Sequence, residues 1–480
     1  MEAAMQNTQT AASSDKRFKV IPIMVALLIS GFIGMFSETA LNVALNDLMQ
    51  VLHISPPTAQ WLTTGYLLTL GILVPVSGLL LQWFTTRQLF ITALIFSIAG
   101  CLIAALAPSF EVLLVARVVQ AVGTGIMLPL MFNTILVIFP AEKRGAAMGI
   151  IGLVIMFAPA VGPTIAGLLI ENLSWHWIFW LSLPFLVLAL VCGILFMQNV
   201  STITKPKIDL LSIILSTIGF GGIVFGFSSA GEGGGWTSPK VIASLIIGIA
   251  ALLLFGWHQL RMKQPMINLR AFKYPMFSVG VVMVFISMMI ILSSMLVLPL
   301  FLQGGFGKSA FYAGLIMLPG GIVNGLMSPL MGRLFDKYGP KWLVFPGFIV
   351  AAAALWFFSG VTAASAAFLI IVLHSCLMIG ISMIMMPAQT NGLNQLPREY
   401  YPDGTAIMNT LQQVAGAIGT AVAVSIMSAG QESYFKTHPG GNPIDALTAG
   451  VSHAFMFGMI IALAGFVIGL FIKRVPVKHD

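Results

Sequence analysis

Charged residues are scarce in this chain. Only 8% of its 480 residues are Asp, Glu, Lys or Arg, whereas 58% are hydrophobic. A soluble domain carries about 25% charged residues, so the composition excludes a soluble globular protein and predicts a chain embedded in the lipid bilayer. The net charge of +8 is better explained by where the basic residues lie along the chain, so we expect no nucleic-acid partner.

Cysteine and the motifs of catalytic proteins are equally scarce. The three cysteines, Cys101, Cys192 and Cys376, each lie in an apolar run, and their spacing indicates neither a metal site nor a disulfide framework. The sequence has no nucleotide-binding loop, no cluster of metal ligands, no Ser/His/Asp set and no repeated selectivity filter. We therefore expect no enzyme activity, no cofactor and no channel.

What the chain does have is fourteen apolar runs, most of them near the 20 or so residues that cross a bilayer as a helix. No segment between them is long enough for a folded soluble domain. The sequence thus predicts an all-α polytopic membrane protein. The runs lie near residues 20–45, 58–81, 88–107, 112–137, 146–170, 178–197, 209–229, 240–260, 277–301, 310–332, 341–361, 364–388, 403–429 and 449–472.

Lysine and arginine indicate the orientation. With the amino terminus inside, all but four of the 23 lie in inner segments; the exceptions are Lys240, Lys308 and Lys436 in outer loops and Arg117 within a span. The positive-inside rule then predicts that both termini are cytoplasmic. The basic residues before the first span precede no small-residue cleavage site, which indicates an uncleaved first span.

A carboxylate interrupts the first apolar run. Glu38 lies about 27 Å along a helix that begins at residue 20, in the half of the membrane far from the amino terminus. Ionisable residues at such depth are costly to bury and usually face a wet cavity and carry function. The alternative is that Glu38 lies at the far interface and only touches water.

Arg117 is the matching cation. It lies about 9 Å from the outer end of the fourth span, at a depth similar to that of Glu38. Opposite charges on neighbouring helices stabilise each other, so protonation of Glu38 would free Arg117. A static pair that only holds two helices together is the alternative.

Two related loops indicate an internal repeat. Residues 78–87 (GLLLQWFTTR) end the second span and residues 332–341 (GRLFDKYGPK) end the tenth. Internal repeats around a central site are typical of secondary transporters. We therefore predict six-span halves at 20–197 and 277–472, two inserted spans within 198–276, and short tails at 1–19 and 473–480.

Together with three further motifs, these loops resemble the major facilitator superfamily, specifically its fourteen-span drug:proton antiporters of the lincomycin-resistance type. Residues 38–45 (ETALNVAL) resemble the first-span acidic motif, with Glu38 where aspartate is usual. Residues 117–125 (RVVQAVGTG) resemble the arginine motif of the fourth span, and residues 149–167 resemble the antiporter motif of the fifth.

The resemblance implies roles for several residues. Glu38 and Arg117 would couple transport to protons, and the fifth span would pack against the tenth. The first loop departs from the family pattern, because Gln82 and Thr85 replace aspartate and glycine, so a charge-based gate would depend on the second loop. The antiporter-motif residues are Gly149, Gly162, Pro163 and Gly167, and the inner-gate residues are Gln82, Arg87, Asp336 and Lys337.

Candidate substrate contacts lie on the spans that the family arranges around a cavity. Methionine is frequent in the ninth and twelfth spans, and its flexible, polarizable side chain can adapt to unlike ligands. Packing in the core or against lipid is the alternative for each of these side chains. The candidates are Asn42, His374, Met289, Met383, Gln412 and Gln413.

The expected function is proton-coupled export of amphipathic drugs, such as lincosamides, dyes or lipophilic cations, by alternating access. The expected protein is a monomer in the cytoplasmic membrane of a bacterium. Since Glu38 is the only carboxylate expected well inside a span, coupling should be close to one proton per cycle. The alternative is proton-coupled transport of one metabolite or lipid on the same fold.

Overall fold

The computed structural model describes residues 20–475 except 55, 141–142, 201–202, 206–208, 231–234 and 264. Within this part of the chain, fourteen helices are long and apolar enough to span a membrane, and the prediction of fourteen spans in an all-α protein is confirmed. They are α2 (Val20–Val51), α3 (Pro56–Trp83), α4 (Thr86–Ala105), α5 (Phe110–Ile138), α6 (Arg144–Asn172), α7 (His176–Phe196), α8 (Leu210–Ser229), α9 (Pro239–Arg261), α10 (Pro275–Gly304), α11 (Ala310–Tyr338), α12 (Lys341–Ser359), α13 (Ala367–Asn394), α14 (Tyr401–Thr437) and α15 (Pro443–Gly469).

Several helices continue past the ends of the predicted spans. The twelfth span was expected to end near residue 388, yet α13 runs to Asn394. Its last turns carry polar side chains such as Gln389 and Asn391, which are buried in protein. Polar residues that are covered by other helices can lie inside a membrane-spanning helix. A span predicted from apolar residues alone therefore ends too early at this point of α13.

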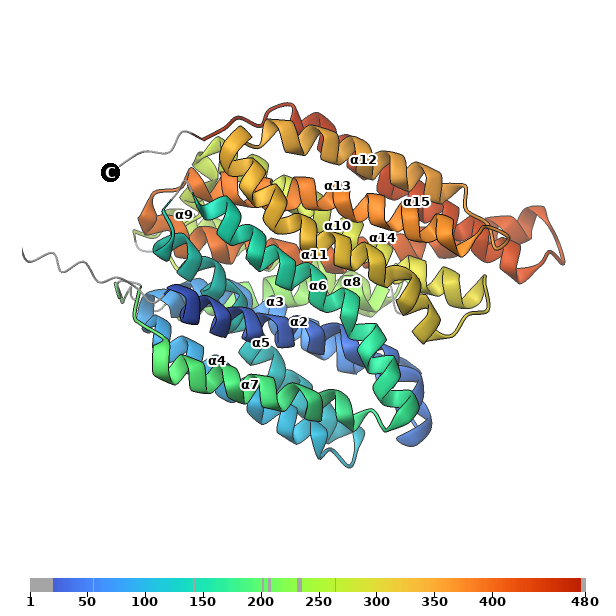
Figure 1. Cartoon of the computed structure of the whole chain (residues 1–480), viewed down its shortest axis with the longest axis horizontal. Coiled ribbons are helices and arrows are strands. Elements are labelled where there is room, and N and C mark those ends of the chain that lie inside the picture. The colour runs from blue at the N-terminus through green and yellow to red at the C-terminus, as the bar shows by residue number, and fades with distance from the viewer. Residues whose placement is uncertain are drawn as a thin grey trace, which may run out of the picture.

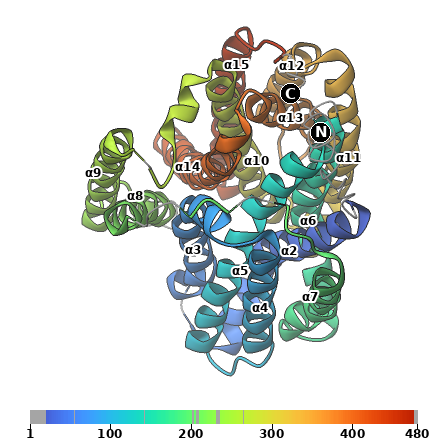
Figure 2. The same cartoon turned by 90° about the vertical axis from the view of Figure 1, so that its left-hand side faces the viewer.

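The helices form two groups with α6 between them (Figures 1 and 2). One group contains α2, α3, α4, α5 and α7, and the other contains α10 to α15. Helix α6 packs against both α2 and α11. The start of α2 and the end of α15 lie at the same end of the molecule. The division at residues 198 and 276 stays a prediction.

Helices α8 and α9 lie beside both groups (Figure 2), and α8 packs against α3 and α14. Val224 of α8 packs with Val414 and Ala417 of α14. The segment that follows α9 is also attached to α14, because the backbone N–H of Asn268 donates to Asp403 at 3.0 Å. Asp403 lies in the first turn of α14, and its side chain is buried.

Asp209 joins the start of α8 to the end of α9. It caps α8 by accepting from the backbone N–H of Ser212 at 3.1 Å, and it pairs with Nε2 of His258 on α9 at 2.6 Å. The hydrogen bonds from Ser212, followed by the contact with His258, hold the pKa of Asp209 below its usual range. The charged carboxylate is therefore the form that these contacts stabilise.

Replacing Asp209 tests this junction. Asp209→Asn should lower the free energy of unfolding by about 1 kcal/mol or less at neutral pH, because it removes a partly exposed ion pair and weakens a helix cap. A carboxylate with a lowered pKa stabilises the fold above its usual pKa and loses this effect as the pH falls. The difference in melting temperature in detergent should therefore shrink below about pH 4. Glu432→Gln, which alters an exposed pair with Lys436, is the matched control.

Candidate functional site

Arg117 is a fully buried cation that connects three helices. Its Nη1 donates to the backbone carbonyl of Ser37 on α2 at 2.9 Å and to Oε1 of Gln120 at 3.1 Å. Its guanidinium lies 4.1 Å from the ring centroid of Tyr66 on α3. The side chain is 0% exposed, so these contacts replace hydration, and the arginine holds α2, α3 and α5 together.

Glu38 follows directly after Ser37, the residue whose carbonyl binds Arg117. Its Oε2 is buried and has no hydrogen-bond partner within the described part of the chain, and the same is true of Nη2 of Arg117. The structure gives no direct ion pair between Glu38 and Arg117 in that part, although their charges interact through space. Glu38 can therefore take up a proton without breaking a hydrogen bond of this oxygen.

Asp336 joins the last turn of α11 to the first turn of α6. Its two carboxylate oxygens accept from the backbone N–H groups of Gly145 and Ala146, each at 3.0 Å. Free N–H groups and the helix dipole make the start of a helix a favourable place for a carboxylate. This contact holds the end of α11 against the start of α6, at the end of the molecule where α2 starts.

Arg144 strengthens the same end. It is buried, and its Nη1 donates to Tyr401 Oη at 2.6 Å and to Asn394 Oδ1 at 3.2 Å. A side chain at the start of α6 thus binds the end of α13 and the start of α14. The backbones also come very close, since a Cβ added at Gly332 would collide with the carbonyl of Gly145.

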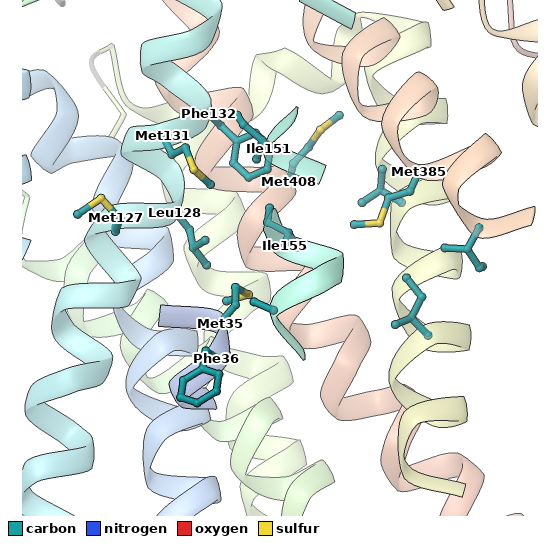
Figure 3. Close-up of a cluster of buried hydrophobic side chains, with 14 of the residues drawn as sticks. Met35, Phe36, Met127, Leu128, Met131, Phe132, Ile151, Ile155, Met385 and Met408 are labelled. Carbon is teal, nitrogen blue, oxygen red and sulfur yellow. The ribbon is translucent and has the colours of Figure 1, made fainter. Parts of the chain in front are cut away.

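A cluster of buried apolar side chains includes residues from both groups of helices (Figure 3). It draws on α2, α5, α6, α13 and α14, and it includes Phe36, Leu128, Phe132, Ile151 and Ile155. We call the methionines that are labelled in Figure 3 the central methionine cluster. They are Met35, Met127, Met131, Met385 and Met408.

Comparison with known proteins identifies the family. The family model described as "Major Facilitator Superfamily" matches residues 27–420. The chain belongs to the Major Facilitator Superfamily. It is 72% identical over 478 residues to the lincomycin resistance protein LmrB of Bacillus subtilis, covering 98% of this chain and 99% of the relative. It is 65% identical to the protein of the same name from Listeria monocytogenes, covering 97% and 99%.

A solved structure of the same superfamily has the same fold. The proton:xylose symporter XylE aligns with a TM-score of 0.67 over 95% of this chain and 96% of its own, at 13% sequence identity. The chain is thus a multi-pass membrane protein with the fold of superfamily transporters. The resemblance drawn from the sequence motifs is confirmed at the level of the family.

The antiporter-motif glycines face two different helices. A Cβ at Gly149 would lie 2.5 Å from the backbone carbonyl of Ser328 on α11, and one at Gly167 would touch Phe311 at 3.6 Å. Packing of the fifth span on the tenth, implied by the resemblance, is therefore seen as α6 on α11. Gly162, next to Pro163, instead faces Thr39 of α2, and α6 remains one helix through Pro163.

The four residues assigned to the inner gate divide into two kinds. Asp336 bridges two helices as described, and Lys337 is exposed over Tyr338. Gln82 contacts the segment after α7, accepting from the N–H of Thr204 at 3.1 Å. Arg87 donates to the carbonyl of Ile194 at the end of α7 at 2.7 Å. These contacts of Gln82 and Arg87 reach α7 and the segment that follows it, and do not join the two halves.

The candidate cavity residues are scattered. His374 is buried against Gly320 of α11, and the half-buried Met383 packs near the end of α11 and the start of α12. Met289 is half-buried and lies against Gly419 of α14. Gln412 is buried, whereas Gln413 is half-buried. The side chain of Asn42 lies outside the described residues.

Sequence reasoning missed Tyr66, Arg144 and most of the central methionine cluster. In the positive-inside pattern Arg144 counts only as one of the basic residues of the inner segments. The sequence does not show that its side chain faces α13 and α14. Met127 and Met131 are spaced i, i+4 on α5, which places them on one helix face. That spacing was the available signal for their common position.

Proposed function

We propose that this protein exports amphipathic drugs in exchange for protons. The observation that carries the proposal is Glu38, a carboxylate inside the membrane whose buried oxygen is free to bind a proton beside a buried arginine. The names of the two relatives, which report lincomycin resistance, support a drug as cargo. Intramembrane carboxylates that face the protein interior are typical of proton-driven transporters.

The mechanism follows from the contacts at the two ends of the transport path. Protonation removes the negative charge of Glu38, so Arg117 loses its electrostatic partner and the packing of α2 against α5 changes. Opening toward the cytoplasm requires the bonds of Asp336 and Arg144 to break, since both join α6 to the second half. The small residues of α6 and α11 allow these helices to move past each other in close contact.

We propose further that both termini are cytoplasmic, that the protein acts as a monomer in a bacterial membrane, and that it needs no cofactor. The basic inner segments support the orientation. The start of α2 and the end of α15 lie at one end of the molecule, as an even number of spans requires.

Purified protein in liposomes tests the proposed function. An imposed proton gradient should drive lincomycin accumulation in vesicles, and lincomycin added without a gradient should move protons in the opposite direction. Collapse of the gradient with a protonophore should end accumulation. Lincomycin movement that does not respond to the gradient would contradict proton coupling, and the absence of any lincomycin movement would contradict drug transport.

A further inference from the structure

Gln389 is a buried amide with no hydrogen bond. Its side chain is 1% exposed, and neither Nε2 nor Oε1 has a partner within the described part of the chain. Buried polar groups are nearly always hydrogen-bonded, so an exception calls for an explanation. A transporter offers one, because a group unpaired in one conformation can bind cargo in another.

Gln389 shares a helix face with side chains that point to the centre of the molecule. It follows Met385 and Met386 of α13 by four and three residues, and such neighbours lie on one face of a helix. Met385 belongs to the central methionine cluster (Figure 3). Met386 lies against Gly152 of α6. Gln389 therefore lies one turn from the cluster, on the side of the closed α6–α11 end.

Gln412 has the same relation to the cluster from α14. It follows Met408 by four residues, is 5% exposed, and its Nε2 has no partner among the described residues. Along the helices, Gln389 lies about 8 Å from the inner end of α13 and Gln412 about 17 Å from the inner end of α14. By the same measure Met131, Met385 and Met408 lie between these two levels, at about 10 to 14 Å, so an amide stands on each side of these three methionines.

The helix stretches that carry Met127, Met131, Met385 and Met408 contain no charged side chain, whereas on α2 Glu38 follows Met35 by three residues. Residues 118–138 of α5, 145–170 of α6, 367–394 of α13 and 404–431 of α14 contain no Asp, Glu, Lys or Arg. Recognition of a polar group here depends on neutral donors and acceptors. An amide offers both, and hydroxyl and amide groups of a ligand can pair with either.

We propose that Gln389 and Gln412 bind the uncharged polar groups of the cargo while the central methionine cluster holds its apolar part. The favoured substrates are then amphipathic molecules with hydroxyl or amide groups, in preference to lipophilic cations that lack hydrogen-bonding groups. This inference rests on the proposed function and names the substrate class of the same site. It makes Gln389 a specificity-determining residue.

Gln389→Leu tests the proposal with two probes, lincomycin and tetraphenylphosphonium, in liposomes. Loss of a neutral hydrogen-bonding partner should raise the KM for lincomycin about tenfold and leave that for tetraphenylphosphonium unchanged. Gln303→Leu, at the outer end of α10, is the matched control and should change neither. An unchanged KM for lincomycin, or an equal rise for both probes, would overturn the proposal. If the wild-type protein moves neither probe, the proposed function itself fails.

A labelling experiment does not depend on transport by the leucine variant. In a chain whose three native cysteines are replaced, Gln389→Cys should react with a maleimide more slowly when lincomycin is present. Gln303→Cys should react at the same rate with and without lincomycin. Elution of each variant as a single species in size-exclusion chromatography establishes that it is folded. Equal labelling of Gln389→Cys with and without lincomycin would count against a binding role.

Discussion

Glu38→Gln should abolish proton-driven export while leaving the protein folded and inserted. Glutamine has nearly the same shape but does not titrate, so the site keeps its packing and loses its proton. The fold should tolerate the change because Oε2 of Glu38 has no hydrogen bond to lose among the described residues. Lincomycin-driven proton release from liposomes measures the effect, and we expect none above the protein-free background.

Two further variants sharpen this test. Glu38→Asp keeps a titratable group and should retain part of the activity. Glu171→Gln removes an exposed carboxylate near the end of α6 and should behave like the wild type. Exchange of labelled for unlabelled lincomycin needs no net proton movement and should persist in Glu38→Gln. Normal proton release by Glu38→Gln would contradict the assignment of Glu38 as the proton-coupling site.

Asp336→Asn should slow export far more than Gln82→Ala. The carboxylate of Asp336 binds two backbone N–H groups at the start of α6, and the asparagine amide can accept only one of these bonds and carries no charge. Such a carboxylate contributes about 0.3 to 2 kcal/mol at a helix start, and a lost hydrogen bond to a charged group adds to this. We expect export to fall roughly tenfold to thirtyfold.

Gln82→Ala removes a side chain whose Oε1 accepts a long hydrogen bond, 3.4 Å, from the hydroxyl of Thr204. Export by this variant should stay within about twofold of the wild type, since exposed polar contacts contribute little. Initial rates at matched protein levels in the membrane provide the comparison. Similar rates for the two variants would show that the closed end does not depend on Asp336.

The sequence pattern of the first span predicted the depth of Glu38 but not the partners of Arg117. The depth of Glu38 followed from the rise per residue and the length of the apolar run, and both are local properties. That Arg117 would bind the Ser37 carbonyl and the Tyr66 ring did not follow. Two other helices, α2 and α3, provide these partners, and nothing in residues 20–48 specifies how α2, α3 and α5 are rotated toward one another.

The sequence of the fifth span likewise predicted close helix packing, but not which glycine faces which helix. Its small residues indicated close helix contact, and the family resemblance named the tenth span as partner. Which glycine faces which helix depends on how α6 is rotated about its axis, and this placed Gly149 and Gly167 on α11 but Gly162 on α2. Because glycines occur on several faces of α6, composition could not distinguish them.

The sequence by itself determined the membrane class, the fourteen spans and the family, because transfer into lipid depends on the apolarity of each segment one by one. The tertiary structure decided which polar groups meet. It brought Asp336 to the start of α6, carried Arg144 to Tyr401, and, within the part of the chain that is described, left the amide of Gln389 unpaired beside the methionines. These outcomes depend on the rotation and register of each helix against its neighbours, and packed side chains on several helices fix them together.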